Sequence, residues 1–164
     1  ELGLTFVKDI TELGDRKFDV IALFHTLEHV WNPVDFLRVL ARYLVPGGII
    51  VIEVPNVNDA LVALYKIPAY VTFYYQKAHL YYFSHATLAR TIALAGGRAE
   101  ITGLQRYDLS NHLRWAIDGQ PGGQGYYNAV LVDQVQTAYA EALVQAGFSD
   151  TLWAVAVFGA DGPF

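Results

Sequence analysis

The sequence predicts an α/β fold, a doubly wound sheet that is mostly parallel. Two apolar runs, 18–24 (FDVIALF) and 49–54 (IIVIEV), have the near-continuous hydrophobicity of strands covered on both faces. A helix pattern lies between them, so strand, helix and strand form a crossover unit. The last two strand-like runs, 99–107 and 151–158, are expected to form an antiparallel pair at the edge of the sheet.

The first half of the chain alternates between strands and a helix. A short strand is expected at 4–7, followed by a polar loop. A helix is predicted over 32–48. Asn32 can accept hydrogen bonds from its free amides, and Pro33 stands where a missing N–H costs nothing. Pro-Gly-Gly at 46–48 is expected to end this helix.

The second half has two stretches without a clear period, 55–83 and 108–127, which are predicted to be loop-rich caps over the sheet. Between them, Ser84 is expected to cap a helix that glycines end. A long amphipathic helix is predicted over 128–147, before the last strand. The sequence contains no repeat and no linker, so a single domain over 1–164 is expected.

Composition limits the class of protein. The 164 residues are 54% hydrophobic, which predicts a packed core, and the absence of cysteine excludes disulfides and thiolate zinc sites. No apolar run approaches the roughly 20 residues of a membrane helix, so we expect a cytoplasmic protein with no membrane partner. The net charge of −5, without a basic stripe, argues against nucleic acid. The opening residues ELGLTFVKD are typical of a domain interior, so we expect a fragment.

The string FHTLEHVWNP contains His25-x-x-Glu28-His29, which fits an inverted zinc-peptidase signature. Two zinc ligands four residues apart require about two turns of helix. Here a strand ends just before His25 and a new helix begins at Asn32. The motif therefore lies at the carboxyl end of a strand, where ligands bind in open α/β sheets. We predict no metal there, and a zinc hydrolase remains a remote alternative.

The segment 18–56, FDVIALFHTLEHVWNPVDFLRVLARYLVPGGIIVIEVPN, resembles the central segment of class I S-adenosylmethionine-dependent methyltransferases. The segment 79–97, HLYYFSHATLARTIALAGG, is similar to a later pattern of the same family. Two further stretches, QRYDLSNHLRWAIDGQPGG and SDTLWAVA, resemble a subgroup associated with bacterial sugar or polysaccharide modification. The resemblance implies methyl transfer from S-adenosylmethionine to a small-molecule or saccharide acceptor.

The resemblance also implies a Rossmann-like sheet that is truncated at its N-terminus. Asp9 and Ile10 match positions that contact adenine, and Phe24, His25 and Thr26 match the turn beside the ribose and methionine parts. The glycine-rich cofactor loop of the family would lie upstream of Glu1, so this fragment alone is expected to be inactive. The alternative is a non-catalytic binding or structural module on the same scaffold. The missing first strands would uncover a sheet edge, which predicts self-association.

Methyl transfer requires donor and acceptor held in line, and an acidic acceptor also needs a base. Histidine is best matched to neutral pH. His79 is the preferred base or acceptor-orienting residue, and the other candidates are His29 and His112. The structural alternatives are an aromatic anchor for His79 and a turn brace for Glu28 and His29. The predicted acceptor contacts are Asn56, Tyr81 and Tyr82, with Tyr74 and Tyr75 as further stacking candidates.

Overall fold

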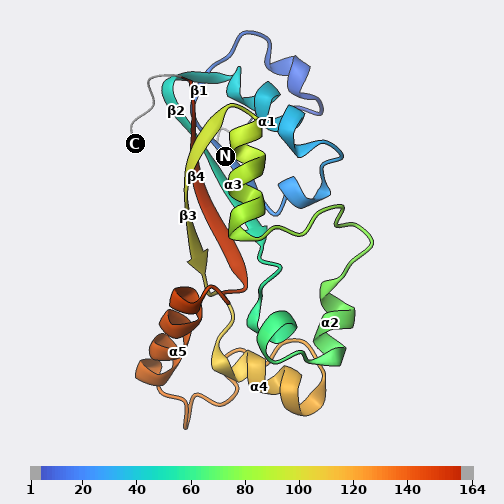
Figure 1. Cartoon of the computed structure of the whole chain (residues 1–164), viewed down its shortest axis with the longest axis vertical. Coiled ribbons are helices and arrows are strands. Elements are labelled where there is room, and N and C mark those ends of the chain that lie inside the picture. Colours follow the sequence, from blue (N-terminus) through green and yellow to red (C-terminus); the bar gives the residue numbers. More distant parts are fainter. Residues whose placement is uncertain (1–4, 160–164) are drawn as a thin grey trace.

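A computed structural model describes residues 5–159 and shows a sheet flanked by helices, with a second group of helices at one end of it (Figure 1). The elements along the chain are η1 (Ile10–Leu13), β1 (Phe18–Phe24), η2 (Leu27–His29), α1 (Pro33–Ala41), β2 (Leu44–Pro55), η3 (Ala60–Leu64), α2 (Pro68–Tyr74), α3 (His85–Leu94), β3 (Gly97–Leu104), α4 (Leu109–Asp118), α5 (Asp133–Ala146) and β4 (Thr151–Phe158). The α/β prediction is thus confirmed. No helix in residues 5–159 is long and apolar enough to cross a membrane.

The sheet has four strands in the order β1-β2-β4-β3. Only β1 and β2 are parallel, because β4 lies between β2 and β3 and is antiparallel to both. The chain enters β4 at the carboxyl end of β2, where Thr151 pairs with Pro55, and must therefore run back along it. The predicted antiparallel pair is confirmed, but the prediction of a mostly parallel sheet is wrong.

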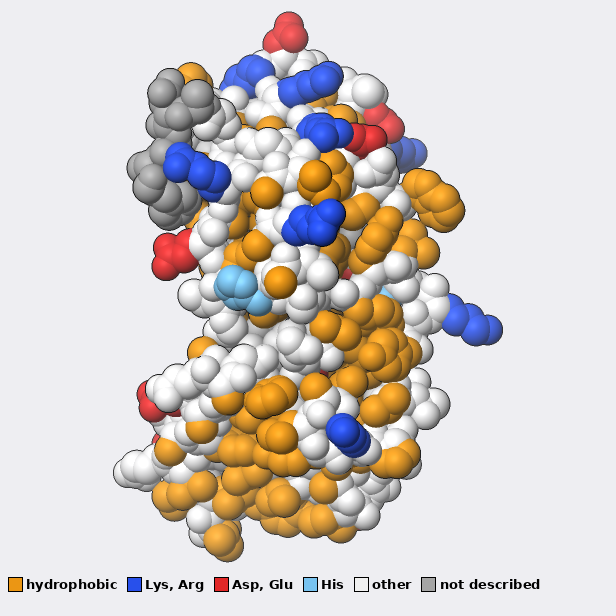
Figure 2. All heavy atoms as spheres, viewed as in Figure 1, with side chains coloured by type: hydrophobic (Ala, Val, Ile, Leu, Met, Phe, Trp, Pro, Cys, Tyr) orange, Lys and Arg blue, Asp and Glu red, His pale blue; other side chains and the backbone are white. Residues whose placement is uncertain are grey.

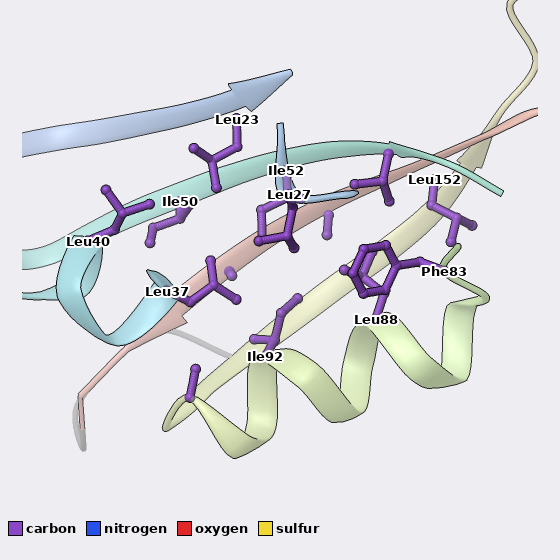
Figure 3. Close-up of a cluster of buried hydrophobic side chains, with 14 residues drawn as sticks. Leu23, Leu27, Leu37, Leu40, Ile50, Ile52, Phe83, Leu88, Ile92 and Leu152 are labelled. Carbon is purple, nitrogen blue, oxygen red and sulfur yellow. The ribbon is translucent and has the colours of Figure 1, made fainter. Parts of the chain in front are cut away.

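The core of the sheet lies on the face that α1 and α3 cover. Leu37 of α1 and Leu88 of α3 are fully buried against Ile50 and Ile52 of β2 (Figure 3). The opposite face is less covered, since Val20 and Phe24 of β1 each keep 54% of their surface exposed. The sheet therefore owes its stability chiefly to one apolar layer between the strands and these two helices.

Helix α1 begins as predicted and ends early. The Asn32 side chain accepts from the Asp35 amide, and Pro33 occupies the first helical position. The helix ends at Ala41, whereas Pro-Gly-Gly at 46–48 lies inside β2. The strand register shifts there between the pairs Phe18 with Leu44 and Val20 with Ile49. Pro-Gly-Gly therefore forms an irregularity of the strand, and its predicted role as a helix stop is wrong.

The predicted strand at 4–7 is also corrected. Residues 5–7 form no strand, and Leu4 lies outside the described residues. The long helix is shorter than predicted, because α5 begins at Asp133. Both errors come from short apolar runs, whose period does not distinguish a strand or helix from extended chain.

The two predicted cap loops contain short helices, and we call residues 55–83 and 108–127 together the cap. The first contains η3 and α2, and the second contains α4. Tyr70, Tyr74 and Trp115 pack with Leu61 in a small core of their own. Figure 2 shows hydrophobic side chains gathered over the lower half of the molecule, where α2 and α4 lie. Aromatic packing between distant segments, rather than sequence periodicity, stabilises these helices.

Candidate active site

A cavity of about 340 Å³ lies between the cap and the edge of the sheet where β1 and β2 end. His25 and Glu28 line it on the sheet side, and His79, Tyr74 and Trp115 line it on the cap side. A volume of this size suits a small ligand. The carboxyl ends of parallel strands are also the usual ligand edge of an α/β sheet. The two observations make this cavity the candidate active site.

His25 follows β1 directly and has a backbone φ of +46°, in the left-handed region that non-glycine residues seldom adopt. Its Nδ1 lies 3.4 Å from Oε1 of Glu28, and its Nε2 lies 3.2 Å from Oε1 of Glu53. The ring can donate to both carboxylates only when both nitrogens carry hydrogen. Strained backbone of this kind is concentrated at functional sites. The His25 ring thus joins two buried carboxylates at the cavity edge.

Glu53 is held from a second direction. It is buried at 3% exposure, and its carboxylate accepts from Nε of Arg106 at 2.8 Å and also from Nη2 of the same guanidinium. The Arg106 amide donates to Asp150 at 2.8 Å. This bidentate pair fixes the Glu53 carboxylate beside His25.

Glu28 is different, because neither of its carboxylate oxygens has a hydrogen-bond partner among the described residues, although the side chain is 1% exposed. Its backbone carbonyl accepts from the amides of Leu80 and Tyr81 at 2.8 and 3.2 Å. These bonds attach the cap segment to the turn after β1. The Glu28 backbone therefore braces the turn, while its carboxylate remains free to act in the cavity.

His29 and His79 approach the same carboxylate. Nδ1 of His29 lies 2.9 Å from the Ala78 carbonyl, so it carries the hydrogen, and its Nε2 is left as an acceptor 3.9 Å from Oε1 of Glu28. The His29 and His79 ring centroids are 4.7 Å apart. Burial lowers the pKa of His79, which favours its neutral ring. One ligand atom from each of Glu28, His29 and His79 lies within 4.8 Å of the others.

His112 lies elsewhere, on α4, with its side chain against α5. It is 4% exposed, with Nδ1 2.7 Å from the Tyr139 hydroxyl and Nε2 3.3 Å from the Gln105 side chain. Burial lowers the pKa of His112 to about 4. His112 does not line the cavity, in contrast to His25 and His79.

The predicted acceptor contacts are also outside the lining of the cavity. Asn56 is buried, and its side chain donates to the Ser149 carbonyl at 2.8 Å. The Tyr81 hydroxyl donates to the Trp31 carbonyl, and the Tyr82 hydroxyl donates to the Tyr74 carbonyl. These three side chains support the cap, and Tyr74 is the tyrosine from the predicted stacking set that lines the cavity.

The predicted cofactor residues divide into two places. Phe24, stacked on Trp153 at a centroid distance of 5.9 Å, lies with His25 and Thr26 at the end of β1. Thr26 donates its hydroxyl to the Phe24 carbonyl at 3.0 Å. Asp9 caps η1, and hydrogen bonds from Thr11 lower its pKa. Ile10 packs partly buried against the core of the sheet.

The sequence interpretation missed the carboxylates on the cap side of the cavity. Asp59 accepts from the Tyr70 hydroxyl and the Leu61 amide, each at 2.7 Å, and burial raises its pKa to about 6. Burial also raises the pKa of Asp150, which lines the same cavity. The available signal was that Asp59 and Asp150 each stand just before an apolar run, where a carboxylate can be buried with the run. Buried carboxylates are rare and usually have partners.

Comparison with known proteins identifies the family. Residues 4–98, more than half of the chain, match the methyltransferase domain family. The chain belongs to this family. A ubiquinone biosynthesis O-methyltransferase from Caulobacter sp. (strain K31) is 39% identical to this methyltransferase domain over 56 residues, which cover 34% of the chain and 22% of that relative. The Caulobacter vibrioides enzyme of the same name is 41% identical over 56 residues and is also covered to 22%.

Two solved structures share the fold of this methyltransferase domain. One is a chain from the complex of the Haloferax volcanii Trm112 methyltransferase activator with a methyltransferase, at a TM-score of 0.52, 18% identity, and coverage of 92% of this chain and 57% of that one. The other is an S-adenosylmethionine-dependent methyltransferase from Archaeoglobus fulgidus, at a TM-score of 0.50, 18% identity, and coverage of 89% and 61%. The chain therefore spans about three fifths of these structures' length.

Proposed function

We propose that this methyltransferase domain transfers a methyl group from S-adenosylmethionine to a small-molecule or saccharide acceptor in the cavity under the cap. The observation that carries the proposal is the position of the cavity at the carboxyl ends of β1 and β2, in a chain of this family. The motif at His25, Glu28 and His29 also supports it. η2 has only three residues, so the two histidines do not share the long helix of a zinc peptidase.

The end of β1 fits the chemistry of the donor. The Phe24 ring is 54% exposed and offers an apolar surface beside the ribose and methionine parts of the donor. The buried carboxylate of Glu28 provides negative charge beside His25, which suits a sulfonium cation, whereas that of Glu53 is paired with Arg106. Phe24, His25 and Thr26 would hold the donor, with Asp9 and Ile10 assigned to its adenine end. When bound, S-adenosylmethionine supplies an electrophilic methyl carbon.

The residues of the chain supply the rest of the chemistry. The cap, held to the turn after β1 by the Leu80 and Tyr81 amides, limits access of water to the acceptor. His79 is proposed as the base, because burial lowers its pKa and keeps the ring ready to accept a proton near neutral pH. His29 is proposed to orient the acceptor through Nε2, because its Nδ1 is held by the Ala78 carbonyl.

Calorimetric titration of S-adenosylmethionine into the chain tests this proposal. We expect weak binding that His25→Ala reduces at least fivefold. His85→Ala is the matched control, because this exposed histidine on α3 does not line the cavity. We expect it to leave the affinity unchanged. No heat of binding at millimolar donor would contradict the methyltransferase proposal and favour a non-catalytic module. Equal binding by both variants would contradict the placement of the donor.

A further inference from the structure

Three atoms in the candidate active site lack partners and converge on one point. The two carboxylate oxygens of Glu28 and Nδ1 of His79 are buried without a hydrogen bond among the described residues. Nε2 of His29 is held 3.9 Å from Glu28 by the bond that its Nδ1 makes to Ala78. A ligand atom from each of the three residues lies within 4.8 Å of the others. The site is therefore a cluster of acceptors without a hydrogen-bonded donor, and the nearest donor to Glu28 is Nδ1 of His25 at 3.4 Å.

A buried carboxylate without a partner is costly, so the cluster indicates a cationic ligand. A metal ion and an ammonium group differ in the spacing they require. Tetrahedral zinc with bonds of about 2.0 Å places its ligands about 3.3 Å apart. An ammonium nitrogen with hydrogen bonds of about 2.8 Å suits acceptors about 4 to 4.6 Å apart. The 3.9 Å between Oε1 of Glu28 and Nε2 of His29 lies between these two spacings, so the rest of the cavity decides which cation it suits.

The rest of the cavity favours an organic cation. None of the described residues that line it is a lysine or an arginine, whereas Asp59 and Asp150 add two further carboxyl groups. Phe73 and Trp115 provide aromatic surface, which accommodates hydrocarbon and attracts cations to the ring faces. An acceptor that carries a carboxylate or phosphate would meet the carboxyl groups of Glu28, Asp59 and Asp150 without a lysine or arginine in the described lining to offset them, so the cavity selects against it.

We propose that the acceptor is an aliphatic amine, bound as its ammonium by Glu28, His29 and His79 and methylated on nitrogen. This inference rests on the proposed function and narrows its acceptor to one with an amino group. An ammonium group has three N–H donors, one for each residue of the cluster. The apolar part of the amine lies against the aromatic residues of the cap.

The reaction balances without any further reactant. His79, as the neutral imidazole, takes one proton from the ammonium and becomes the imidazolium. The freed nitrogen lone pair forms a bond to the methyl carbon of the sulfonium donor as the carbon–sulfur bond breaks. The electron pair of that bond stays on sulfur, which leaves a neutral thioether. The product is the N-methylated ammonium, and His79 then releases its proton to water.

Binding of three probes of equal chain length tests the inference: n-butylammonium, 1-butanol and butanoate, titrated at pH 7 and followed by calorimetry. We expect n-butylammonium to bind at least tenfold more tightly than either of the others. Glu28→Gln keeps the shape of the side chain and removes its charge, so it should weaken n-butylammonium at least tenfold. Glu141→Gln, at an exposed carboxylate on α5, is the control and should change the affinity less than twofold.

Two further measurements keep the result decisive. In ¹⁵N-histidine spectra, n-butylammonium should shift the ring signals of His29 and His79 and leave that of His85 unchanged. Equal binding of 1-butanol, or an unchanged affinity in Glu28→Gln, would overturn the inference. Stoichiometric micromolar binding of zinc that His79→Gln abolishes would assign the cluster to a metal and overturn it too. Donor binding without preference for the amine contradicts this inference alone, whereas amine selectivity without donor binding contradicts the methyltransferase proposal and leaves only the amine site of this inference.

Discussion

The sheet and the cap bury their side chains in different ways. The sheet core is almost entirely hydrocarbon, with Leu37, Leu88 and Ile52 packed between helices and strands. The cap core combines Tyr70 and Trp115 with carboxyl groups that are buried and hydrogen-bonded. Apolar packing tolerates changes in pH, whereas buried ionisable groups respond to it. The sheet core therefore stabilises the molecule chiefly through apolar packing, and the cap adds buried ionisable groups to the cavity.

The largest expected effect is in the sheet. Leu88→Ala would leave a cavity under α3, because Leu88 is fully buried, and should lower the free energy of unfolding by about 2–5 kcal/mol. The loss should be the same at pH 5 and pH 7. Urea denaturation measures it, with Leu80→Ala as the control, since Leu80 is 48% exposed in the cap and should lose less than about 0.5 kcal/mol. A loss that depends strongly on pH would contradict the claim that the sheet core is stabilised chiefly by apolar packing.

The second prediction concerns Asp59 and His112 of the cap, whose titrations change the stability in opposite directions. Asp59 has a folded pKa of about 6, raised from 3.8, so its contribution to stability is present below pH 4 and is lost as pH rises to about 6. His112 has a folded pKa of about 4, lowered from 6.5, so its contribution is gained as pH rises from 4 to 6.5. Each shift corresponds to up to about 3 kcal/mol, and the two nearly cancel in the unmodified chain.

Single substitutions should separate these two titrations. Between pH 4 and 6.5, the stability of Asp59→Asn should rise, because His112 titrates alone, and the stability of His112→Gln should fall, because Asp59 titrates alone. The slopes are read from urea midpoints at several pH values. Asp150 and Asp108, which face Asp59 and His112, are common to both variants, so the difference between the slopes is diagnostic. Parallel slopes would contradict the assignment.

A smaller loss is expected for Tyr70→Phe, which removes the hydroxyl that donates to Asp59 at 2.7 Å. The unsatisfied carboxylate should cost about 1–3 kcal/mol, and more above pH 6, where Asp59 is ionised, than below it. Thermal unfolding at pH 5 and pH 7.5 measures both quantities. Tyr126→Phe, at a ring 66% exposed, is the control and should be nearly neutral. An equal loss of stability for the two variants would contradict a stabilising role for the hydrogen bond from Tyr70 to Asp59.

The weakest effect is expected at the outer edge of the sheet. Among residues 5–159, β1 pairs only with β2, and Val20 and Phe24 are each 54% exposed on its open face. An unpaired strand edge recruits another chain, so we predict weak self-association that Val20→Lys reduces. Light scattering at increasing protein concentration measures it. A clean monomer at the highest concentration would count against this prediction.

The same contrast explains what could be predicted from the sequence. FDVIALF at 18–24 and the Asn32-Pro33 helix start carry local signals of period and capping, and β1 and the start of α1 lie where those signals placed them. The helices α2 and α4 depend on contacts of Tyr70 with Trp115, which no local period records. The antiparallel pairing of β4 with β2, which makes the sheet mixed, was not predicted, because it depends on where the chain returns, which is a property of the whole fold.

The candidate site was predictable in part for the same reason. The sequence pattern placed His25 at the end of a strand with Glu28 and His29 in the same motif, and His79 was predicted as a base in a different segment. Their convergence depends on hydrogen bonds from the Leu80 and Tyr81 amides to the Glu28 carbonyl, which join segments far apart in the sequence. The burial of the Glu28 carboxylate without a hydrogen-bond partner could not be predicted, because it depends on the cap that covers the turn.

The most direct test of the central claim is a ¹⁵N–¹H titration of the chain with S-adenosylmethionine, followed residue by residue. The account predicts that the largest amide shifts occur at Phe24, His25 and Thr26, with smaller shifts at cavity residues of the cap such as Tyr74. Unchanged amides at the end of β1, or shifts confined to the region of His85 on α3 and Ile101 on the edge strand β3, would contradict it.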